Sequence, residues 1–395
     1  MSGFKSVYLD PSTFTLDASS TVRVSQRTSL SDLKILNGDD TLLLENHGTG
    51  TGTFSNNTYN MSVTSGQYRI KCSKHYFPYF SGKSQLIEET FDNFQSEANT
   101  IKRAGYFSSN SIAPFNSNLD GFWVENTGST IDLVVSNFGV EKLRKNITQW
   151  DNYSLISNYD WSKFTVIAFD YLWLGGAVLR LFLKTDKGFV LCNTYNYSGT
   201  ATGTFIKSPN HKVRYEIRST TGTGSFRYIC SQVSTEGSIS ESGKQRSVHT
   251  GTTSLSLTTI GTTYPIKAIR KGSNYRDETM KQIGIKSFVS SNTDVLLTTL
   301  QLNPTLSAPL TYTAIPNSIG EEATGNGTIT VTSPGIILWS DILPQNGMSP
   351  NNILEEEYLS HIGVTLDGVS DQLILCGTPI TSRVTCNGIM NYKEY

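Results

Sequence analysis

Alternation of apolar and polar residues at a period of two runs through most of this chain and limits the folds open to it. In KVRYEIRS (212–219), Val213, Tyr215 and Ile217 fall on one side and the charged residues on the other. This pattern is typical of a strand with one buried face. SFRYICS (225–231) repeats it after a glycine-rich turn, so we predict that the two segments form an antiparallel hairpin. Its outer face would be basic and solvated, with Lys212, Arg214, Arg218 and Arg227.

Other segments are apolar on both faces, which predicts central strands covered on both sides. The most apolar, FTVIAFDYLWL (164–174) and AVLRLFLKT (177–185), should be two buried strands joined at Gly175 and Gly176. We therefore expect an all-β fold, a lectin-like or jelly-roll β-sandwich of two packed sheets. One helix is expected over residues 84–105, where Ser84 could act as its cap and the two phenylalanines lie three residues apart.

The distribution of prolines along the sequence changes after residue 265. Six of the twelve prolines fall between residues 304 and 350, where they separate short apolar segments. We predict a docking arm at residues 1–25, a β-sandwich domain at residues 26–265 and a second β-rich domain at residues 266–395.

Composition and cysteine usage favour a protein that folds without disulfides. Charged residues make up only 16% of the chain and the net charge is −1, which predicts no general attraction to nucleic acid or anionic membrane. The start lacks the apolar region of a signal peptide, so we expect that the chain is made and assembled inside a cell. Five widely spaced cysteines without a C-x-x-C pair indicate buried, reduced thiols.

The glycine-rich stretch GTGTGTF (48–54) could be taken for a phosphate-binding loop. Such a loop needs a helix directly after it, whereas the residues that follow are rich in Thr, Asn and Tyr without helical periodicity. Near copies occur at residues 199–205 and 220–226. We interpret all three as turns that lead into strands.

Candidate catalytic residues are few. The five histidines lie in unrelated contexts, so no metal site is predicted. Acidic residues could form the paired carboxylates of a glycan-cleaving enzyme, but caps and turns explain most of them. The acids considered are Glu88, Glu89, Asp92, Asp120, Glu125, Asp160 and Asp170. Asp170 lies inside an apolar strand and must therefore find hydrogen bonds or an edge.

The segment KHYFPYF (74–80) carries more rings than alternation in one strand can bury. We interpret it as a contact between subunits or a ligand surface. Its candidate residues are His75, Tyr76, Phe77, Tyr79 and Phe80. The five tryptophans could stack on sugars, but most tryptophans in strands belong to a core.

Three stretches carry a resemblance to a known type of protein. They are TFDNFQSEANTIKRAGYFSSNSIAPFNSNLDGFWVEN (90–126), SPNHKVRYEIRSTTGTGSFRYICSQVSTEGS (208–238) and DGVSDQLILCGTPI (367–380). The chain resembles a widespread type of tailed-bacteriophage virion protein, described as a structural, fibre or capsid-associated protein. The resemblance covers about residues 20–265 well and the C-terminal part more loosely. It implies a β-sandwich incorporated into the virion, and it implies no catalytic residues.

We therefore predict a non-enzymatic structural component of a bacteriophage virion, displayed as a head fibre, decoration or tail-associated protein. Two alternatives remain, a glycan-binding receptor-recognition module and a polysaccharide depolymerase. No cofactor and no metal are expected. The expected partners are other copies of the chain, as a trimer by analogy with phage fibres, other virion proteins and a host-surface glycan. No nucleic acid and no membrane insertion are expected.

Overall fold

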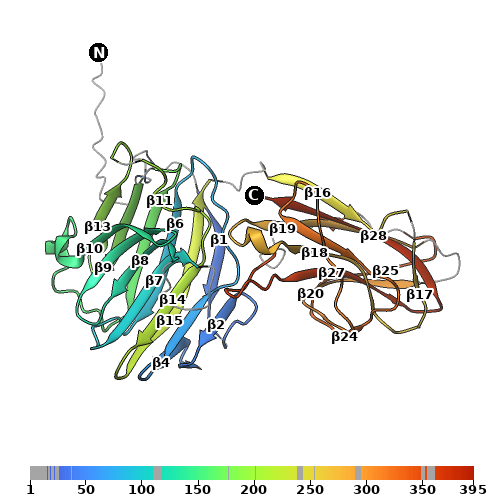
Figure 1. Ribbon diagram of the computed structural model, residues 1–395, viewed down its shortest axis with the longest axis horizontal. Coiled ribbons are helices and arrows are strands. Elements are labelled where there is room, and N and C mark those ends of the chain that lie inside the picture. Colours follow the sequence, from blue (N-terminus) through green and yellow to red (C-terminus); the bar gives the residue numbers. More distant parts are fainter. Residues whose placement is uncertain are drawn as a thin grey trace, which may run out of the picture. The chain divides into compact units, whose positions relative to one another are not determined.

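The structure is a computed structural model of the chain (Figure 1). It describes residues 16, 18, 22, 26–36, 38–109, 118–176, 178–200, 202–237, 243–252, 254–289, 295–347, 352–353 and 361–395. The chain divides into two compact units, Met1–Ser240 and Glu241–Tyr395, which we call unit 1 and unit 2. Most of the predicted docking arm lies outside the described residues.

Unit 1 contains two antiparallel sheets. The first sheet has the strand order β13-β12-β11-β6-β15-β4-β3, and β1 also pairs with β15. It consists of β1 (Arg27–Lys34), β3 (Thr51–Ser55), β4 (Thr58–Val63), β6 (Gln85–Asp92), β11 (Thr165–Leu172), β12 (Val178–Thr185), β13 (Gly188–Asn196) and β15 (Gly224–Glu236). The second sheet has the strand order β10-β9-β8-β7-β14-β5-β2. It consists of β2 (Leu44–Gly48), β5 (Tyr68–Ser73), β7 (Thr100–Ser108), β8 (Asp120–Asn126), β9 (Ile131–Asn137), β10 (Val140–Asn146) and β14 (Val213–Ser219). Two short 3₁₀ helices, η1 (Ile147–Gln149) and η2 (Tyr153–Leu155), follow β10.

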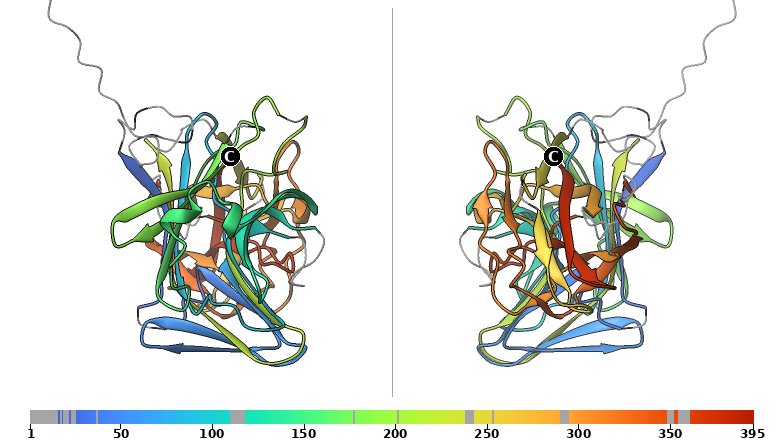
Figure 2. Two further views of the ribbon diagram at one scale, coloured as in Figure 1. Left: turned by 90° about the vertical axis from the view of Figure 1, so that its left-hand side faces the viewer. Right: turned by 90° about the vertical axis from the view of Figure 1, so that its right-hand side faces the viewer.

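The two sheets of unit 1 lie face to face (Figure 1; seen from two further sides in Figure 2). Aromatic side chains fill the space between them. Phe122 on β8 lies 5.1 Å from Phe169 on β11, measured between ring centroids. Tyr215 on β14 lies 4.7 Å from Tyr228 on β15. These contacts join strands of different sheets, so the predicted sandwich is confirmed.

Unit 2 also consists of antiparallel sheets. The five-stranded sheet contains β16 (Lys244–His249), β17 (Leu255–Leu257), β19 (Met280–Val289), β26 (Asn352–Ile353) and β28 (Val384–Glu394). The six-stranded sheet contains β18 (Tyr264–Lys271), β20 (Leu296–Leu302), β22 (Thr313–Ala314), β23 (Gly320–Thr324), β25 (Ile336–Leu343) and β27 (Gln372–Pro379). A small ribbon of β21 (Thr305–Leu306) and β24 (Val331–Ser333) and the 3₁₀ helix η3 (Ser273–Tyr275) complete the described elements.

The core of unit 2 brings its two large sheets together. Ile266 on β18 and Leu375 on β27 belong to one buried cluster with Met390 on β28. Gly388 on β28 allows this approach, because a Cβ there would lie 2.7 Å from Leu375 Cδ2 and 2.8 Å from Ile266 Cγ2. The all-β prediction and the second β-rich unit are therefore confirmed.

The division between the units falls earlier than the expected boundary at residue 265. β16 pairs along its length with β28, from Lys244 opposite Glu394 to His249 opposite Ile389. β17 pairs with the same strand. Residues from 241 onward therefore belong to the second unit, because their hydrogen-bonding partner is the last strand of the chain.

The predicted helix over residues 84–105 is wrong. β6 and β7 occupy this region, and β6 lies between β11 and β15 in the first sheet. The spacing that suggested a helix arises because Phe91 is on a strand while Phe94 follows it, with the positive φ of 59° at Asn93 turning the chain between them. Both rings are fully buried and lie 4.9 Å apart.

The predicted hairpin of residues 212–219 and 225–231 is also wrong. β14 pairs with β5 and β7, whereas β15 pairs with β1, β4 and β6 in the other sheet. The glycine-rich turn therefore crosses from one sheet to the other. The apolar faces of the two strands face each other across the core of the sandwich, where Tyr215 contacts Phe226 and Tyr228.

The predicted basic, solvated face is correct only at Arg218, which is exposed near the end of β14. Lys212 and Arg214 are completely buried, and each pairs with a glutamate. Arg227 lies on the other sheet, where its Nε is 2.5 Å from Asp92 Oδ1. β14 is a central strand with both faces covered, so its alternation separates an aromatic core face from a buried ion-paired face.

Glu89 is the acidic residue that faces the aromatic core. It alternates with Ile87 and Phe91 on β6, and all three are completely buried. Burial raises the pKa of Glu89 from its ordinary 4.5 to about 8, and the Tyr215 hydroxyl offsets part of this shift. The carboxyl group is therefore protonated in the folded chain near neutral pH.

The raised pKa predicts that unit 1 loses stability as the pH rises. The unfolded chain releases the Glu89 proton near pH 4.5, whereas the folded chain keeps it up to about pH 8, so ionisation favours unfolding between these values. We expect the thermal midpoint of the unmodified chain to fall from pH 5 to pH 8. Glu89→Gln should flatten this fall, as measured by near-ultraviolet circular dichroism.

Glu88→Gln is the matched control, because Glu88 is the neighbouring, part-exposed glutamate of the same strand. Its pH profile should follow that of the unmodified chain. A Glu89→Gln profile that also follows the unmodified chain would show that Glu89 does not titrate in this range.

Candidate functional site

The aromatic segment at residues 74–80 lies inside unit 1. His75, Tyr76, Phe77 and Phe80 are each at most 6% exposed, and Tyr79 is half-buried. The Tyr79 ring lies 5.6 Å from the ring of Tyr171, and the Tyr79 hydroxyl accepts a hydrogen bond from the Trp173 backbone. The segment follows β5 as an irregular stretch, so it is not limited to burying alternate residues. It is core, and the interpretation as an exposed contact or ligand surface is corrected.

Asp120 and Glu125, two of the acids considered for catalysis, have structural partners. The Asp120 carboxylate accepts hydrogen bonds from three backbone N–H groups, those of Phe138, Lys207 and Ser208. Glu125 lies 2.5 Å from Arg103 and 2.7 Å from Arg144. Burial opposes its ionisation, but the two arginines outweigh burial and lower the pKa of Glu125.

Asp170 fulfils the expectation that it must find hydrogen bonds. It is completely buried on β11, directly opposite Arg180 on β12, and the two side chains form an ion pair. Ser84 donates to its other oxygen at 2.5 Å. Arg180 also donates to the backbone oxygen of Leu16 at 2.6 Å, so a described residue of the N-terminal segment reaches this pair.

Three polar side chains lie in a row, in the order found in a hydrolytic triad, namely Ser108, His211 and Asp120. Ser108 Oγ is 3.0 Å from His211 Nδ1, and His211 Nε2 is 3.5 Å from Asp120 Oδ2. All three are buried, and Asp120 already holds three backbone N–H groups. The row therefore anchors the loop before β14 to β7 and β8, and it offers no accessible nucleophile.

The glycine-rich loops do not form a phosphate site. β3 begins at Thr51, inside the first stretch, β15 begins at Gly224, inside the third, and β14 is the next strand after the second. At Gly50 a Cβ would lie 2.6 Å from the Ser62 oxygen, so close strand approach requires this glycine. The absence of a helix after these loops, within the part of the chain that the structure describes, agrees with their interpretation as turns.

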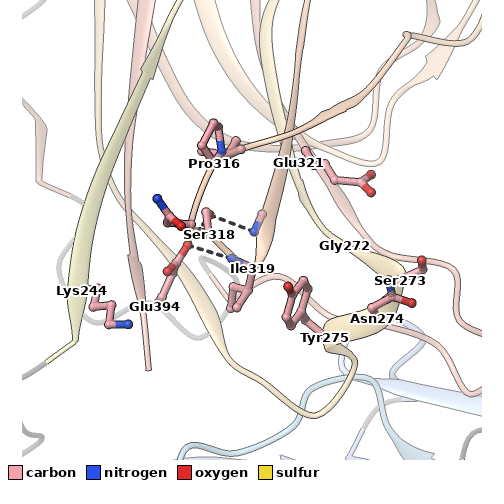
Figure 3. A pocket seen from close by; sticks show the side chains of 14 residues that line it. Lys244, Gly272, Ser273, Asn274, Tyr275, Pro316, Ser318, Ile319, Glu321 and Glu394 are labelled. Atoms are coloured by element: carbon pink, nitrogen blue, oxygen red, sulfur yellow. Dashed lines mark hydrogen bonds between the residues drawn. The ribbon is translucent and has the colours of Figure 1, made fainter.

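A cavity of about 600 Å³ in unit 2 is the candidate functional site (Figure 3). One wall is η3 with its preceding Gly272, and another is the turn from Ile315 to Gly320 that links β22 and β23. The ends of β16 and β28 contribute Lys244 and Glu394. In Figure 3, Lys244 and Glu394 lie on one side of the turn, while Tyr275 and Asn274 lie on the other.

Hydrogen bonds hold the turn in place from several directions. Glu394 accepts from the Ser318 hydroxyl and from the Ile319 N–H at 3.2 Å. Gly272 N–H donates to the Ile319 oxygen at 2.9 Å, which ties η3 to the turn. Arg246 donates to the backbone oxygen of Asn317, a residue with a positive φ of 56°. The cavity is therefore preformed by contacts that do not involve a ligand.

The two carboxylates at the cavity have different partners. Glu394 is 7% exposed, and besides the turn its Oε2 lies 3.7 Å from Arg246 Nε. Glu321 pairs with Arg270, 2.6 Å from Nε to Oε2. Arg270 in turn lies over the Tyr312 ring, 4.0 Å from its centroid. Both acids are thus committed to structural contacts.

Several polar groups at the cavity are not used in this way. The side chains of Ser273, Asn274 and Asn317 and the Tyr275 hydroxyl make no hydrogen bond to another described residue. Tyr275 is 42% exposed. These groups can bind a ligand without breaking an internal contact.

The cavity could not be found from the sequence. Lys244, Tyr275, Asn317 and Glu394 are spread over 150 residues, and no motif connects them. The local signal is Pro316 with Asn317 and Ser318, which lies in the segment where prolines separate short apolar stretches. Pairing of β16 with β28 places Lys244 opposite Glu394, and the hydrogen bonds of Ile319 with Glu394 and Gly272 bring in the turn and η3.

No group of three or more histidine, cysteine or acidic residues that could hold a metal ion occurs among the described residues. The five cysteines are free, and four of them are buried, as expected from their spacing. Within the described ranges, no helix has the length and apolar character needed to span a membrane.

Comparisons with known proteins add similar folds only. No protein-family model and no curated protein matches the chain. Among solved structures, arcelin-5, a lectin-like defense protein from Phaseolus vulgaris, is 14% identical with a TM-score of 0.35, over 53% of this chain and 99% of that one. A legume lectin-like domain from Entamoeba histolytica is 11% identical with a TM-score of 0.37, over 52% and 97%. Bacillus licheniformis beta-glucanase is 11% identical with a TM-score of 0.35, over 52% and 97%.

The Asp170–Arg180 pair generates a test of the buried-charge argument. Arg180→Met should destabilise unit 1 by about 3–5 kcal/mol, because it leaves a buried carboxylate without its cation. Asp170→Leu combined with Arg180→Met should recover most of this loss, since neither charge remains. Urea unfolding followed by near-ultraviolet circular dichroism measures both.

Lys34→Met provides the control, because the Lys34–Asp32 pair is exposed. It should leave the urea midpoint unchanged. A double variant as unstable as Arg180→Met would contradict the assignment of the loss to the uncompensated charge.

Proposed function

We propose that this chain is a non-enzymatic structural component of a tailed-bacteriophage particle, displayed on it as a head fibre, decoration or tail-associated protein. The observation that carries the non-enzymatic part is the engagement of the acids: Asp120, Glu125 and Asp170 all hold backbone N–H groups, hydroxyls or arginines. The resemblance of residues 20–265 to virion proteins supports the place on the particle. The disulfide-free β-sandwich is consistent with assembly in a bacterial cytoplasm.

Glycan binding is the second candidate, and the cavity in unit 2 favours it. Its turn is preformed and its rim presents an exposed tyrosine with several hydrogen-bonding groups. Depolymerase activity is less well supported, because Glu321 and Glu394 both have arginine partners. A recognition module on a displayed particle component would need glycan binding and no depolymerase activity.

The proposal predicts that the chain is part of the intact particle. Mass spectrometry of purified particles from the phage that encodes the chain should detect it at a stoichiometric level. Antibodies against unit 2 should label these particles in electron micrographs. Particles without the chain, or with the chain hidden from antibody until they are disrupted, would contradict display.

The same proposal predicts no release of reducing ends from host polysaccharide by the purified protein. Steady release that Glu321→Gln or Glu394→Gln abolishes would overturn the non-enzymatic assignment. Unit 2 folding must be checked for Glu394→Gln, because Glu394 supports the turn.

We also propose that the chain is a homo-oligomer, and the phage-fibre class favours a trimer. The aromatic segment at residues 74–80 no longer supports this, since it is buried. Support comes instead from β25, which is hydrogen-bonded on one side to β20. The side chains of Ile337 and Ile342 on this strand are 53% and 60% exposed.

Light scattering at micromolar concentration should give a mass of two or more times 43.5 kDa. Ile337→Lys combined with Ile342→Lys should reduce this mass, and a monomeric unmodified chain would refute the proposal.

A further inference from the structure

We propose that the cavity in unit 2 binds a neutral saccharide, with the Tyr275 ring as the stacking surface and the Asn274 and Asn317 side chains as hydrogen-bonding groups. This inference rests on the glycan-binding candidate above and names its site and ligand class. The argument depends on the shape of the cavity, on the chemistry of its free groups and on its charge.

The cavity has the size and rigidity of a small-molecule site. Its volume of about 600 Å³ lies within the usual range of roughly 300–1,000 Å³ for ligand pockets. The turn from Ile315 to Gly320 is fixed by Glu394, Gly272 and Arg246 before any ligand arrives. Binding therefore costs little ordering of the protein.

Two glycines let the walls approach each other. A Cβ at Gly320 would lie 3.0 Å from Met280 Cε and 3.3 Å from Ser318 Oγ. A Cβ at Gly272 would lie 3.2 Å from the Ile319 oxygen and 3.4 Å from the Tyr275 ring. A side chain at either position would make a tighter contact than usual, so the neighbouring atoms would have to shift by a few tenths of an ångström.

The free groups match the apolar face and the hydroxyl-bearing edge of a sugar ring. Sugars present C–H groups on one face and hydroxyls around the edge, and each hydroxyl both donates and accepts hydrogen bonds. An exposed tyrosine ring suits the apolar face. Asparagine amides donate and accept from one side chain, as sugar hydroxyls require. Asn274 adjoins Tyr275 in η3, and Asn317 lies on the opposing turn.

The charges at the cavity favour a neutral ligand. The lining contains two carboxylates, Glu321 and Glu394, and one cation, Lys244, whereas the arginine partners of the carboxylates, Arg270 and Arg246, are not lining residues. Lys244 remains as a cation on the rim, and its field acts on the neighbouring Glu278, whose pKa is raised chiefly by burial. An acidic saccharide would therefore meet carboxylates as well as the single lysine.

The test measures binding of defined oligosaccharides to the full-length protein. The probes are neutral oligomers of glucose, galactose, mannose and N-acetylglucosamine, together with oligogalacturonate as the acidic member. Saturation-transfer NMR identifies binders, and titration calorimetry gives their affinity. We expect at least one neutral oligomer to bind, with an affinity that changes less than twofold between 50 and 500 mM NaCl.

Variants assign the binding to this cavity. Tyr275→Ala should weaken the affinity at least tenfold, whereas Tyr275→Phe should keep it within threefold because the ring remains. Asn274→Ala and Asn317→Gly should each weaken it about fivefold or more, with glycine chosen at residue 317 because its φ is positive. Tyr153→Ala is the matched control, since Tyr153 lies in a 3₁₀ helix of unit 1, and it should leave the affinity unchanged.

Three outcomes would overturn the inference. They are no binding of any neutral probe, binding that survives Tyr275→Ala in a chain with an unchanged thermal midpoint, and salt-sensitive binding of oligogalacturonate alone. The proposed function fails separately, through particles that lack the chain. Neutral-sugar binding by a chain absent from the particle would support the site and refute the virion role.

Discussion

Buried ionic groups on the second sheet of unit 1 constrain the rest of that unit. Arg103 on β7 lies between Glu125 on β8 and Glu216 on β14. Its Nε is 2.5 Å from Glu125 Oε2, and its Nη1 is 3.3 Å from Glu216 Oε2. These three residues are direct cross-strand partners in the sheet register. A slip of one residue in any of these strands would turn a charge toward the aromatic core. Register and strand order are therefore tied to the pairing of charges that cannot be left unpaired inside the protein.

This constraint also bears on function. Unit 1 uses its acids to satisfy buried cations and backbone N–H groups, as Glu45 does for Lys212 and Asp120 for the loop before β14. Unit 2 uses Glu394 in the same way, but here the supported turn borders an open cavity. Uncommitted polar groups gather at this cavity. The free polar groups of this rigid cavity are the basis of the binding site that we propose.

Parts of the fold could be predicted because they depend on local pattern. β11 and β12 occur where their apolar runs predicted, and the glycines between them mark the connection. The need of Asp170 for partners also followed from its position in an apolar strand. The helix over residues 84–105 and the β14–β15 hairpin failed because local spacing does not say which strand will be the neighbour. The cavity lay beyond sequence reasoning, since its residues come from four distant segments.

The sequence by itself determined the strand content, the free thiols and the need of Asp170 for partners, because these follow from the period of two, from the cysteine spacing and from the position of a charge in an apolar strand. The tertiary structure decided which sheet each strand joins and what covers its second face. Alternation marks two faces of a strand, but a charged face can meet either water or opposite charges. β14 meets opposite charges, and the aromatic segment at residues 74–80 meets the core. Only the assembled sheets supply these partners, because they lie far away along the chain.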